Sequence, residues 1–248
     1  MSETPRFKEP HYQGRHRRTK EPQYKVLLEA VEQHGVSSLG LMVNQSWNQD
    51  PKRTLFTLAR YKFVAQMLAG KRRVLEVGCG DAFGTRLVQQ TGASVTAVDF
   101  DPVFIEDIAA RSDPLWPMVS FVHDMLDGPV DGRFDAVFSL DVLEHISPEQ
   151  EDLFLKNVLR SLDYNGTAIF GMPSLESQEY ASPASRAGHV NCKSGEELRR
   201  LLNCYFHNVF VFSMNDEVIH TGFFPMAHYL IALCCGEKNP QTEPPNVV

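Results

Sequence analysis

Short apolar runs alternate along this chain with stretches in which apolar residues recur every three or four positions. Short runs bounded by turn-forming residues are typical of buried strands. The predicted strands are Arg73–Val77, Ser94–Asp99, Val119–His123, Ala136–Leu140, Thr167–Met172, Asn208–Ser213 and Tyr229–Cys235.

Helical spacing connects these runs and also precedes the first of them. In the segment 55–68, for example, Leu55, Leu58 and Phe63 can share one helix face. A later segment opens with Ser194 and has Glu197 three residues on, which predicts a capping box. The predicted helices are Tyr24–Gln33, Leu55–Leu68, Thr85–Gln90, Pro102–Ala110, Glu149–Leu162 and Ser194–Tyr205.

The order of these elements predicts the fold class. From residue 73 onward strands and helices take turns, the pattern of a mostly parallel, doubly wound α/β sheet with helices on both faces. The expected organisation is a flexible basic tail at 1–22, an N-terminal helical cap at 23–70, one cofactor-binding domain at 71–237 and a flexible tail at 238–248.

The stretch Val77-Gly78-Cys79-Gly80 runs from the first predicted strand into a turn. Gly78 and Gly80 lack a Cβ atom, so a ligand can approach the backbone closely, and the amides that open the next helix can bind its polar atoms. A dinucleotide fingerprint needs a third glycine one residue earlier than Gly84. Glu76 is expected to project toward the mouth of the turn, where it suits a cationic ligand better than a diphosphate. A nicotinamide cofactor is therefore disfavoured.

Acidic residues follow the next two predicted strands. Asp99 ends the second strand, where a carboxylate can accept both hydroxyls of a ribose, and the neighbouring Phe100 can lie on a purine. Asp101 is expected to cap the next helix, because Asp-Pro is a good helix start. Asp124 follows the third strand. It is a candidate for a cofactor contact, and the alternative is a polar residue that only ends the strand.

Composition narrows the class of protein. The chain has 248 residues, 43% of them hydrophobic, and a net charge of −7, which argues against non-specific binding to nucleic acid or an anionic membrane. Its five cysteines lack paired C-x-x-C spacing, which predicts free thiols in a reducing compartment. No apolar stretch approaches the length of a membrane span. We therefore expect a cytoplasmic enzyme.

Two motifs carry a resemblance to a known family. Glu76-x-Gly78-x-Gly80 is similar to motif I of the class I S-adenosylmethionine-dependent methyltransferases, and F-D-A-V-F-S-L-D-V-L-E-H-I at 134–146 looks like their small-molecule branch, which includes ubiquinone and sugar methyltransferases. The resemblance implies a seven-stranded sheet whose last strand is antiparallel, and S-adenosyl-L-methionine as the cofactor. With the residue patterns it indicates cofactor contacts by Arg60, Glu76, Gly78, Cys79, Gly80, Asp99, Phe100, Asp124, Met125 and Leu140.

Asp141, Glu144 and His145 are spaced so that they can converge on one helical turn. The set resembles the metal-binding E-x-x-E-H of ubiquinone O-methyltransferases and of small-RNA 2′-O-methyltransferases, in which a later histidine completes the site; His189 would take that place. The same run also resembles many methyltransferases without a metal. A divalent metal is therefore not favoured.

The segment Pro173–Cys192 is longer than a usual loop after a strand and is a candidate lid. It contains His189, our choice of general base, because an imidazole titrates near neutral pH. His145 is the second candidate catalytic residue. The alternative for His189 is a structural histidine that binds backbone near a helix start.

The resemblance implies transfer of a methyl group to an oxygen or nitrogen of a small polar metabolite, such as a sugar or another biosynthetic intermediate. One alternative is a methyltransferase acting on RNA or protein, with the basic tail as a docking arm. Another is a non-catalytic module that keeps the fold and binds the cofactor. The partner expected here is a small-molecule acceptor, not nucleic acid.

Overall fold

A computed structural model of the chain describes residues 19–238. The chain divides into two compact units, the first ending at Leu39 and the second beginning at Gly40. The first unit contributes the helix α1 (Lys25–His34), close to its predicted bounds. The tail predicted at 1–22 lies almost wholly outside the described residues, and so does the one at 238–248.

The second unit is built on one sheet, in the strand order β3-β2-β1-β4-β5-β8-β6-β7. The strands β1 to β5 are all parallel to one another, whereas β8 is antiparallel to both β5 and β6. The strand bounds are β1 Arg73–Val77, β2 Ser94–Asp99, β3 Val119–Val122, β4 Phe134–Leu140, β5 Leu162–Pro173, β6 Phe206–Asn215, β7 Val218–His220 and β8 Tyr229–Glu237.

All seven predicted strands are present, and the antiparallel last strand is confirmed. The expected strand number is wrong by one, because β7 pairs with β6 at the edge of the sheet. With three residues it is too short to show alternation in the sequence. The strand β5 also starts at Leu162, five residues earlier than predicted, and so ends α6 there.

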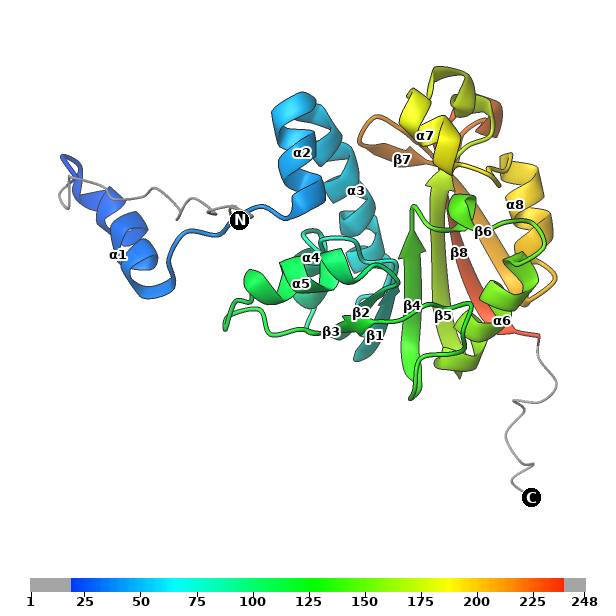
Figure 1. The fold of residues 1–248 in the computed structure, drawn as a ribbon, viewed down its shortest axis with the longest axis horizontal. Coiled ribbons are helices and arrows are strands. Elements are labelled where there is room, and N and C mark those ends of the chain that lie inside the picture. Colours follow the sequence, from blue (N-terminus) through cyan, green and yellow to red (C-terminus); the bar gives the residue numbers. More distant parts are fainter. Residues whose placement is uncertain (1–18, 239–248) are drawn as a thin grey trace, which may run out of the picture. The chain divides into compact units, whose positions relative to one another are not determined.

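Helices cover both faces of this sheet (Figure 1). The cluster containing Val64 and Ala65 of α3 and Val88 of α4 packs on one face, and α6 and α8 pack on the other. The helices of this unit are α2 Leu41–Gln49, α3 Lys52–Met67, α4 Thr85–Gln89, α5 Pro102–Ala110, α6 Glu151–Ser161, α7 Pro183–Gly188 and α8 Gly195–Leu202.

The sequence patterns missed α2 and α7. In α2 only Val43 is buried, so its apolar side chains do not trace a helical stripe. The α7 helix lies in the segment predicted as a candidate lid, where the 3-10 helix η3 (Glu176–Tyr180) precedes it. That segment is therefore folded into two short helices. Within residues 19–238, no helix combines the length and apolarity needed to cross a membrane.

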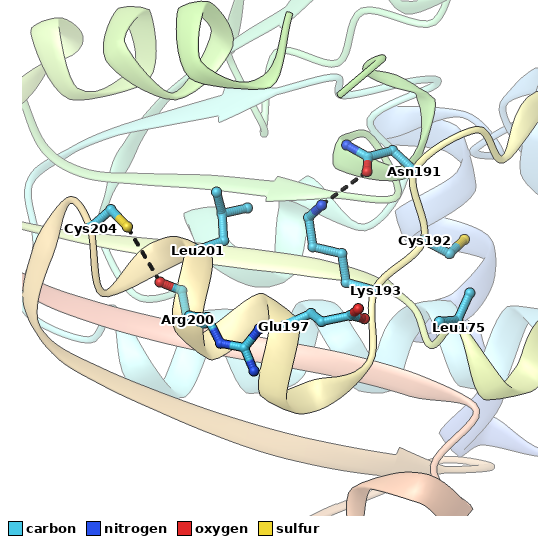
Figure 2. Close-up of a pocket in the computed structure, with 8 residues that line it drawn as sticks. All are labelled: Leu175, Asn191, Cys192, Lys193, Glu197, Arg200, Leu201 and Cys204. Carbon is cyan, nitrogen blue, oxygen red and sulfur yellow. Dashed lines mark hydrogen bonds between the residues drawn. The ribbon is translucent and has the colours of Figure 1, made fainter. Parts of the chain in front are cut away.

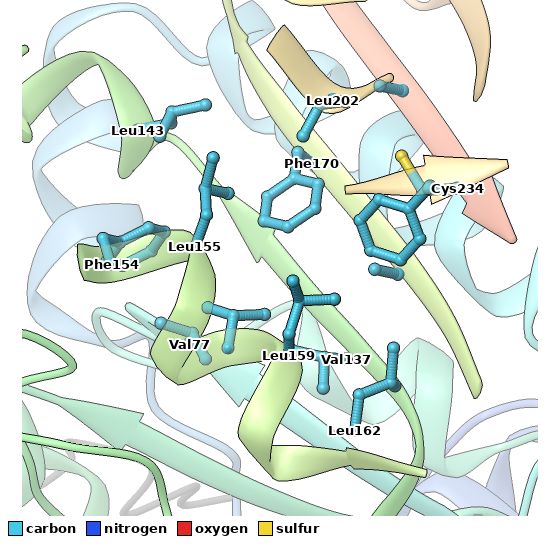
Figure 3. Close-up of a cluster of buried hydrophobic side chains, with 14 of the residues drawn as sticks. Val77, Val137, Leu143, Phe154, Leu155, Leu159, Leu162, Phe170, Leu202 and Cys234 are labelled. Atoms are coloured by element: carbon cyan, nitrogen blue, oxygen red, sulfur yellow. The ribbon is translucent and has the colours of Figure 1, made fainter. Parts of the chain in front are cut away.

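Figure 3 shows the core on the α6 side of the sheet, where Phe154, Leu155 and Leu159 of α6 point toward the strands. They meet Val137 of β4 and Phe170 of β5, and all are at least 95% buried. Each such side chain contributes about 1.5 to 3 kcal/mol through burial. This packing holds β4 and β5 in register, and their carboxyl ends carry the polar side chains described next.

Candidate active site

The glycine turn connects β1 with α4 and is tied to the end of β2. Gly78 and Gly80 have φ angles of +72° and +52°, which side chains with a Cβ rarely adopt. A Cβ at Gly78 would lie 2.1 Å from the Val142 side chain that follows β4. The amide of Gly80 donates to Asp99 Oδ2 at 2.9 Å. The ends of β1, β2 and β4 therefore meet at this turn.

The late glycine, Gly84, has a packing role. A Cβ there would lie 2.3 to 2.6 Å from ring atoms of Tyr61 in α3, and the φ of Gly84 is an ordinary −74°. The absence of a side chain thus lets α3 lie against the start of α4. The late position of Gly84 therefore matches the place where α3 packs, and the sequence pattern could not show this contact.

Glu76 is buried beside the same contact. Tyr61 Oη and Thr85 Oγ1 each donate to one of its carboxylate oxygens at 2.6 Å. Burial raises the pKa of Glu76 to about 7, against the opposing effect of these two hydrogen bonds. The expectation that Glu76 projects toward the mouth of the turn is wrong, because only 1% of it is exposed; a role toward a cofactor stays a prediction.

Asp99 and Phe100 stand together at the end of β2. The second oxygen of Asp99 accepts from the amide of Asp101 at 3.0 Å, and Asp101 caps α5 through the amide of Val103, as predicted. The Phe100 side chain is largely exposed. Asp99 itself is buried and both its oxygens accept backbone amides, so ribose binding by Asp99 and stacking of a purine on Phe100 stay predictions.

The next strand ends offer less accessible side chains. Asp124 is partly buried and accepts from the amide of Leu126 at 2.8 Å. The Met125 side chain is buried in the core, as are Cys79 and Leu140. Ser139 Oγ is buried and has no hydrogen-bond partner among residues 19–238.

Arg60 of α3 is occupied by an ion pair. Its Nη1 lies 2.7 Å from Asp141 Oδ2 and 3.1 Å from Oδ1, and its guanidinium stacks 3.6 Å from the ring centroid of Tyr229. Burial lowers the pKa of Arg60, but Asp141, Tyr229 and Glu144 together outweigh it, so the net pKa is raised. Arg60 therefore holds Asp141, which has a φ of +58°, and binding of a cofactor carboxylate by Arg60 stays a prediction.

Two histidines face each other beyond β4. Their ring centroids are 5.1 Å apart; His145 Nδ1 lies 2.8 Å from Gly188 O, and His189 Nδ1 lies 2.8 Å from Gln178 Oε1. Since both partners are acceptors, each Nδ1 donates, which leaves Nε2 of a neutral ring as an acceptor. Burial, and then His145, lower the pKa of His189. A neutral His189 can accept a proton.

Glu144 completes this group. Ligand atoms of Glu144, His145 and His189 lie within 4.8 Å of one another, whereas Asp141 is paired with Arg60. Glu144 is fully buried, and neither carboxylate oxygen accepts a hydrogen bond from another residue of the described chain. Burial and the nearby Asp141 raise its pKa well above the usual range. A metal ligand must be ionised, so this shift disfavours an ion at Glu144, and metal binding by these residues stays a prediction.

A cavity of about 410 Å³ lies between α8 and the chain that follows α7, and the sequence patterns did not indicate it (Figure 2). Lys193 enters it and pairs with Glu151 at 2.7 Å. The amide of Asn191 donates to the backbone oxygen of Glu144 at 3.0 Å, so this cavity adjoins the histidine pair. Its lining is Leu175, Asn191, Cys192, Lys193, Glu197, Arg200, Leu201 and Cys204.

Sequence comparisons match this region of the chain. A model of the methyltransferase domain family matches residues 74–166. The mitochondrial ubiquinone biosynthesis O-methyltransferase of Schizosaccharomyces pombe is 33% identical over 103 residues, covering 40% of this chain and 36% of that protein. A probable S-adenosylmethionine-dependent methyltransferase of Mycolicibacterium smegmatis is 28% identical over 120 residues, covering 46% and 44%. The chain thus spans less than half of either relative.

Solved structures of similar fold cover more of the chain. The complex of DhpI with SAH superposes with a TM-score of 0.57 at 19% identity, covering 79% of this chain and 92% of that one. The N-methyltransferase NodS from Bradyrhizobium japonicum, also with SAH, gives 0.54 at 18% identity, covering 77% and 91%. At such identities the likeness shows the fold. Residues 74–166 thus match the methyltransferase domain family, and the chain has the fold of these solved S-adenosylmethionine-dependent methyltransferases.

Proposed function

We propose that this chain transfers the methyl group of S-adenosylmethionine to an oxygen or nitrogen of a small polar metabolite. The observation that carries the proposal is the grouping at one edge of the sheet. The glycine turn, Asp99 and Phe100 offer a site for the donor, and the His145–His189 pair beyond β4 offers a proton acceptor. The ubiquinone biosynthesis relatives support a small acceptor.

The chain has two tasks in this reaction. The sulfonium supplies an activated methyl group, so the protein has to align the acceptor and remove its proton. When bound, the cofactor would give up its methyl group with cleavage of the carbon–sulfur bond, whose electron pair stays on sulfur, as the acceptor atom bonds to the methyl carbon. Nε2 of His189 would take the proton that the acceptor atom loses. The hydrogen bond from Nδ1 to Gln178 fixes the ring orientation and the tautomer.

The thiols agree with the setting we propose, a reducing cytoplasmic compartment. All five cysteines are free, and Cys79 and Cys234 are buried. Burial raises the pKa of the Cys79 and Cys234 thiols far above the usual value, so neither offers a thiolate. No catalytic cysteine is needed for the proposed reaction.

The test separates cofactor binding from proton removal. Calorimetry with S-adenosylhomocysteine should show binding by the wild type, and His189→Ala should keep the same Kd. With a panel of small hydroxylated and amine acceptors, kcat of His189→Ala should fall at least about 100-fold.

The matched control is His207→Ala, which replaces an exposed histidine of β6 and should leave kcat unchanged. Full activity of His189→Ala would remove His189 as the base. A wild type that does not bind S-adenosylhomocysteine would overturn the proposed function. Binding without turnover on any acceptor would favour the non-catalytic module.

A further inference from the structure

Two carboxylates cap the first turn of α2. One belongs to Asp81, next to the glycine turn, and the other to Asp107 of α5. The amide of Val43 donates to Asp81 Oδ2 at 2.8 Å, and the amide of Leu41 donates to Asp107 Oδ2 at 3.3 Å. Amides at this end of a helix have no carbonyl partner within the helix. Asp81 directly follows Gly80, so the glycine turn itself caps a helix that lies far away in the sequence.

The contact is also sterically close. A Cβ at Gly40 would lie 2.4 Å from Cβ, Cγ and Oδ2 of Asp81, and a Cβ at Gly80 would lie 2.6 Å from Met42 Sδ. Val43 is buried and Met42 is half exposed. The thioether of Met42 therefore covers the backbone of the glycine turn at Gly80.

Arg111 connects the two capping carboxylates. Its Nη2 donates to the backbone oxygen of Asp81 at 2.6 Å and to Asp107 Oδ2 at 2.7 Å. Asp81 also accepts from the amide of Phe83 through Oδ1 at 3.2 Å. Since both capping groups are held from α5 and from the turn, the position of α2 depends on the geometry of the glycine turn.

We propose that Asp81 is a positioning residue that docks α2 onto the glycine turn, so that Met42 closes the cofactor site above Gly80. The inference rests on the proposed function, because it takes the cofactor to lie at this turn. Release of the cofactor would then require the hydrogen bond from Val43 to Asp81 to break and the first turn of α2 to lift. The Asp81–Val43 contact would thus set how long the cofactor stays bound.

Gly40→Ala in the full-length protein tests this directly. The added methyl group would clash with the Asp81 side chain and push α2 away from it, while residue 81 keeps its carboxylate. Hydrogen exchange of the protein without cofactor should show a protected Val43 amide in the wild type and an unprotected one in Gly40→Ala. Protection in β1 should stay unchanged. The dissociation rate of S-adenosylhomocysteine, measured by stopped flow, should rise about tenfold, the effect of losing a contact of about 1.4 kcal/mol.

Two further variants separate the docking of α2 by Asp81 from the covering of Gly80 by Met42. Met42→Ala should raise the dissociation rate while the Val43 amide stays protected, and the exposed Gln45→Ala on the same helix should change neither quantity. An unprotected Val43 amide in the wild type would overturn the docking. An unchanged dissociation rate in Gly40→Ala and Met42→Ala would overturn the covering role. Failure of the wild type to bind S-adenosylhomocysteine would instead overturn the proposed function, while exchange at Val43 still reports on docking.

Discussion

Polar side chains at the carboxyl edge of the sheet bind other groups of the same chain. Glu76 receives two hydroxyl groups, Asp141 receives the guanidinium of Arg60, and Asp99 receives two amides. Buried polar groups need such partners because desolvation without them costs several kcal/mol. Each of these residues therefore shapes the site before it contributes a ligand contact.

Glu76 should make stability depend on pH in an unusual direction. Its pKa rises on folding from 4.5 to about 7, so between these values the folded state binds more protons than the unfolded state. The stabilisation is complete below pH 4.5 and is lost as the pH rises to about 7, by about 3 kcal/mol. Glu76→Gln should lose less free energy of unfolding than the wild type between pH 5 and 7.5. Urea unfolding at several pH values checks this, and parallel curves would contradict it.

Chelation should leave methyl transfer unchanged. Asp141 is held by Arg60, which takes one of the predicted ligands away from the group, and burial raises the pKa of Glu144 well above its usual range, which disfavours the ionised form that a metal needs. The measurement is turnover before and after dialysis against EDTA, with the thermal midpoint as a control for structural damage. Loss of activity that Mg²⁺ or Zn²⁺ restores would show that Glu144, His145 and His189 hold a metal.

At the scale of elements, local signals decide where several helices begin. Asp101 caps α5 with Pro102 as its first residue, and Ser194 and Glu197 form the predicted capping box of α8. These signals act within one turn of chain, so they are readable without knowledge of the fold. The helix α7 also starts on a local signal, Ser182 followed by Pro183. The helix α2 differs, since the carboxylates that cap it come from α5 and from the residue after Gly80.

Ser194→Ala should lower the free energy of unfolding by about 1 kcal/mol, because it removes the acceptor for the amide of Glu197. Chemical denaturation with an unchanged m-value would measure it. Glu196→Gln is the matched control in the same turn: its salt bridge to Arg200 is exposed and should contribute little. Equal effects of the two substitutions would show that the capping box does not stabilise α8.

At the scale of the molecule, the sheet brings the strand ends to one edge, while α6 and α8 cover one of its faces and α3 and α4 cover the other. Because β1, β2 and β4 are parallel neighbours, their carboxyl ends meet without any direct contact between them in the sequence. Closure of that edge comes from α2 and α3 on one side and from the α7 segment with its histidine on the other.

Cofactor binding should therefore stabilise the whole molecule. S-adenosylhomocysteine at about 100 times its Kd adds about 2.7 kcal/mol, which for a domain of this size raises the thermal midpoint by about 5 to 10 °C. NAD at the same concentration should produce no shift, since the site lacks the dinucleotide glycine spacing. A shift with NAD and none with S-adenosylhomocysteine would reverse the assignment of the cofactor.

The sequence by itself determined the elements whose signals are local: seven strands, the caps of α5 and α8, and a glycine turn followed by acidic residues at the next strand ends. The tertiary structure alone decided that Arg60 binds Asp141, that Gly84 makes room for Tyr61, that α2 rests on Asp81 and that His189 meets His145. These partners are 23 to 81 residues apart in the chain, taking for example Tyr61 with Gly84 and Arg60 with Asp141. Capping and periodicity depend on neighbours within a turn or a strand, whereas such pairs form only when packing brings distant segments together.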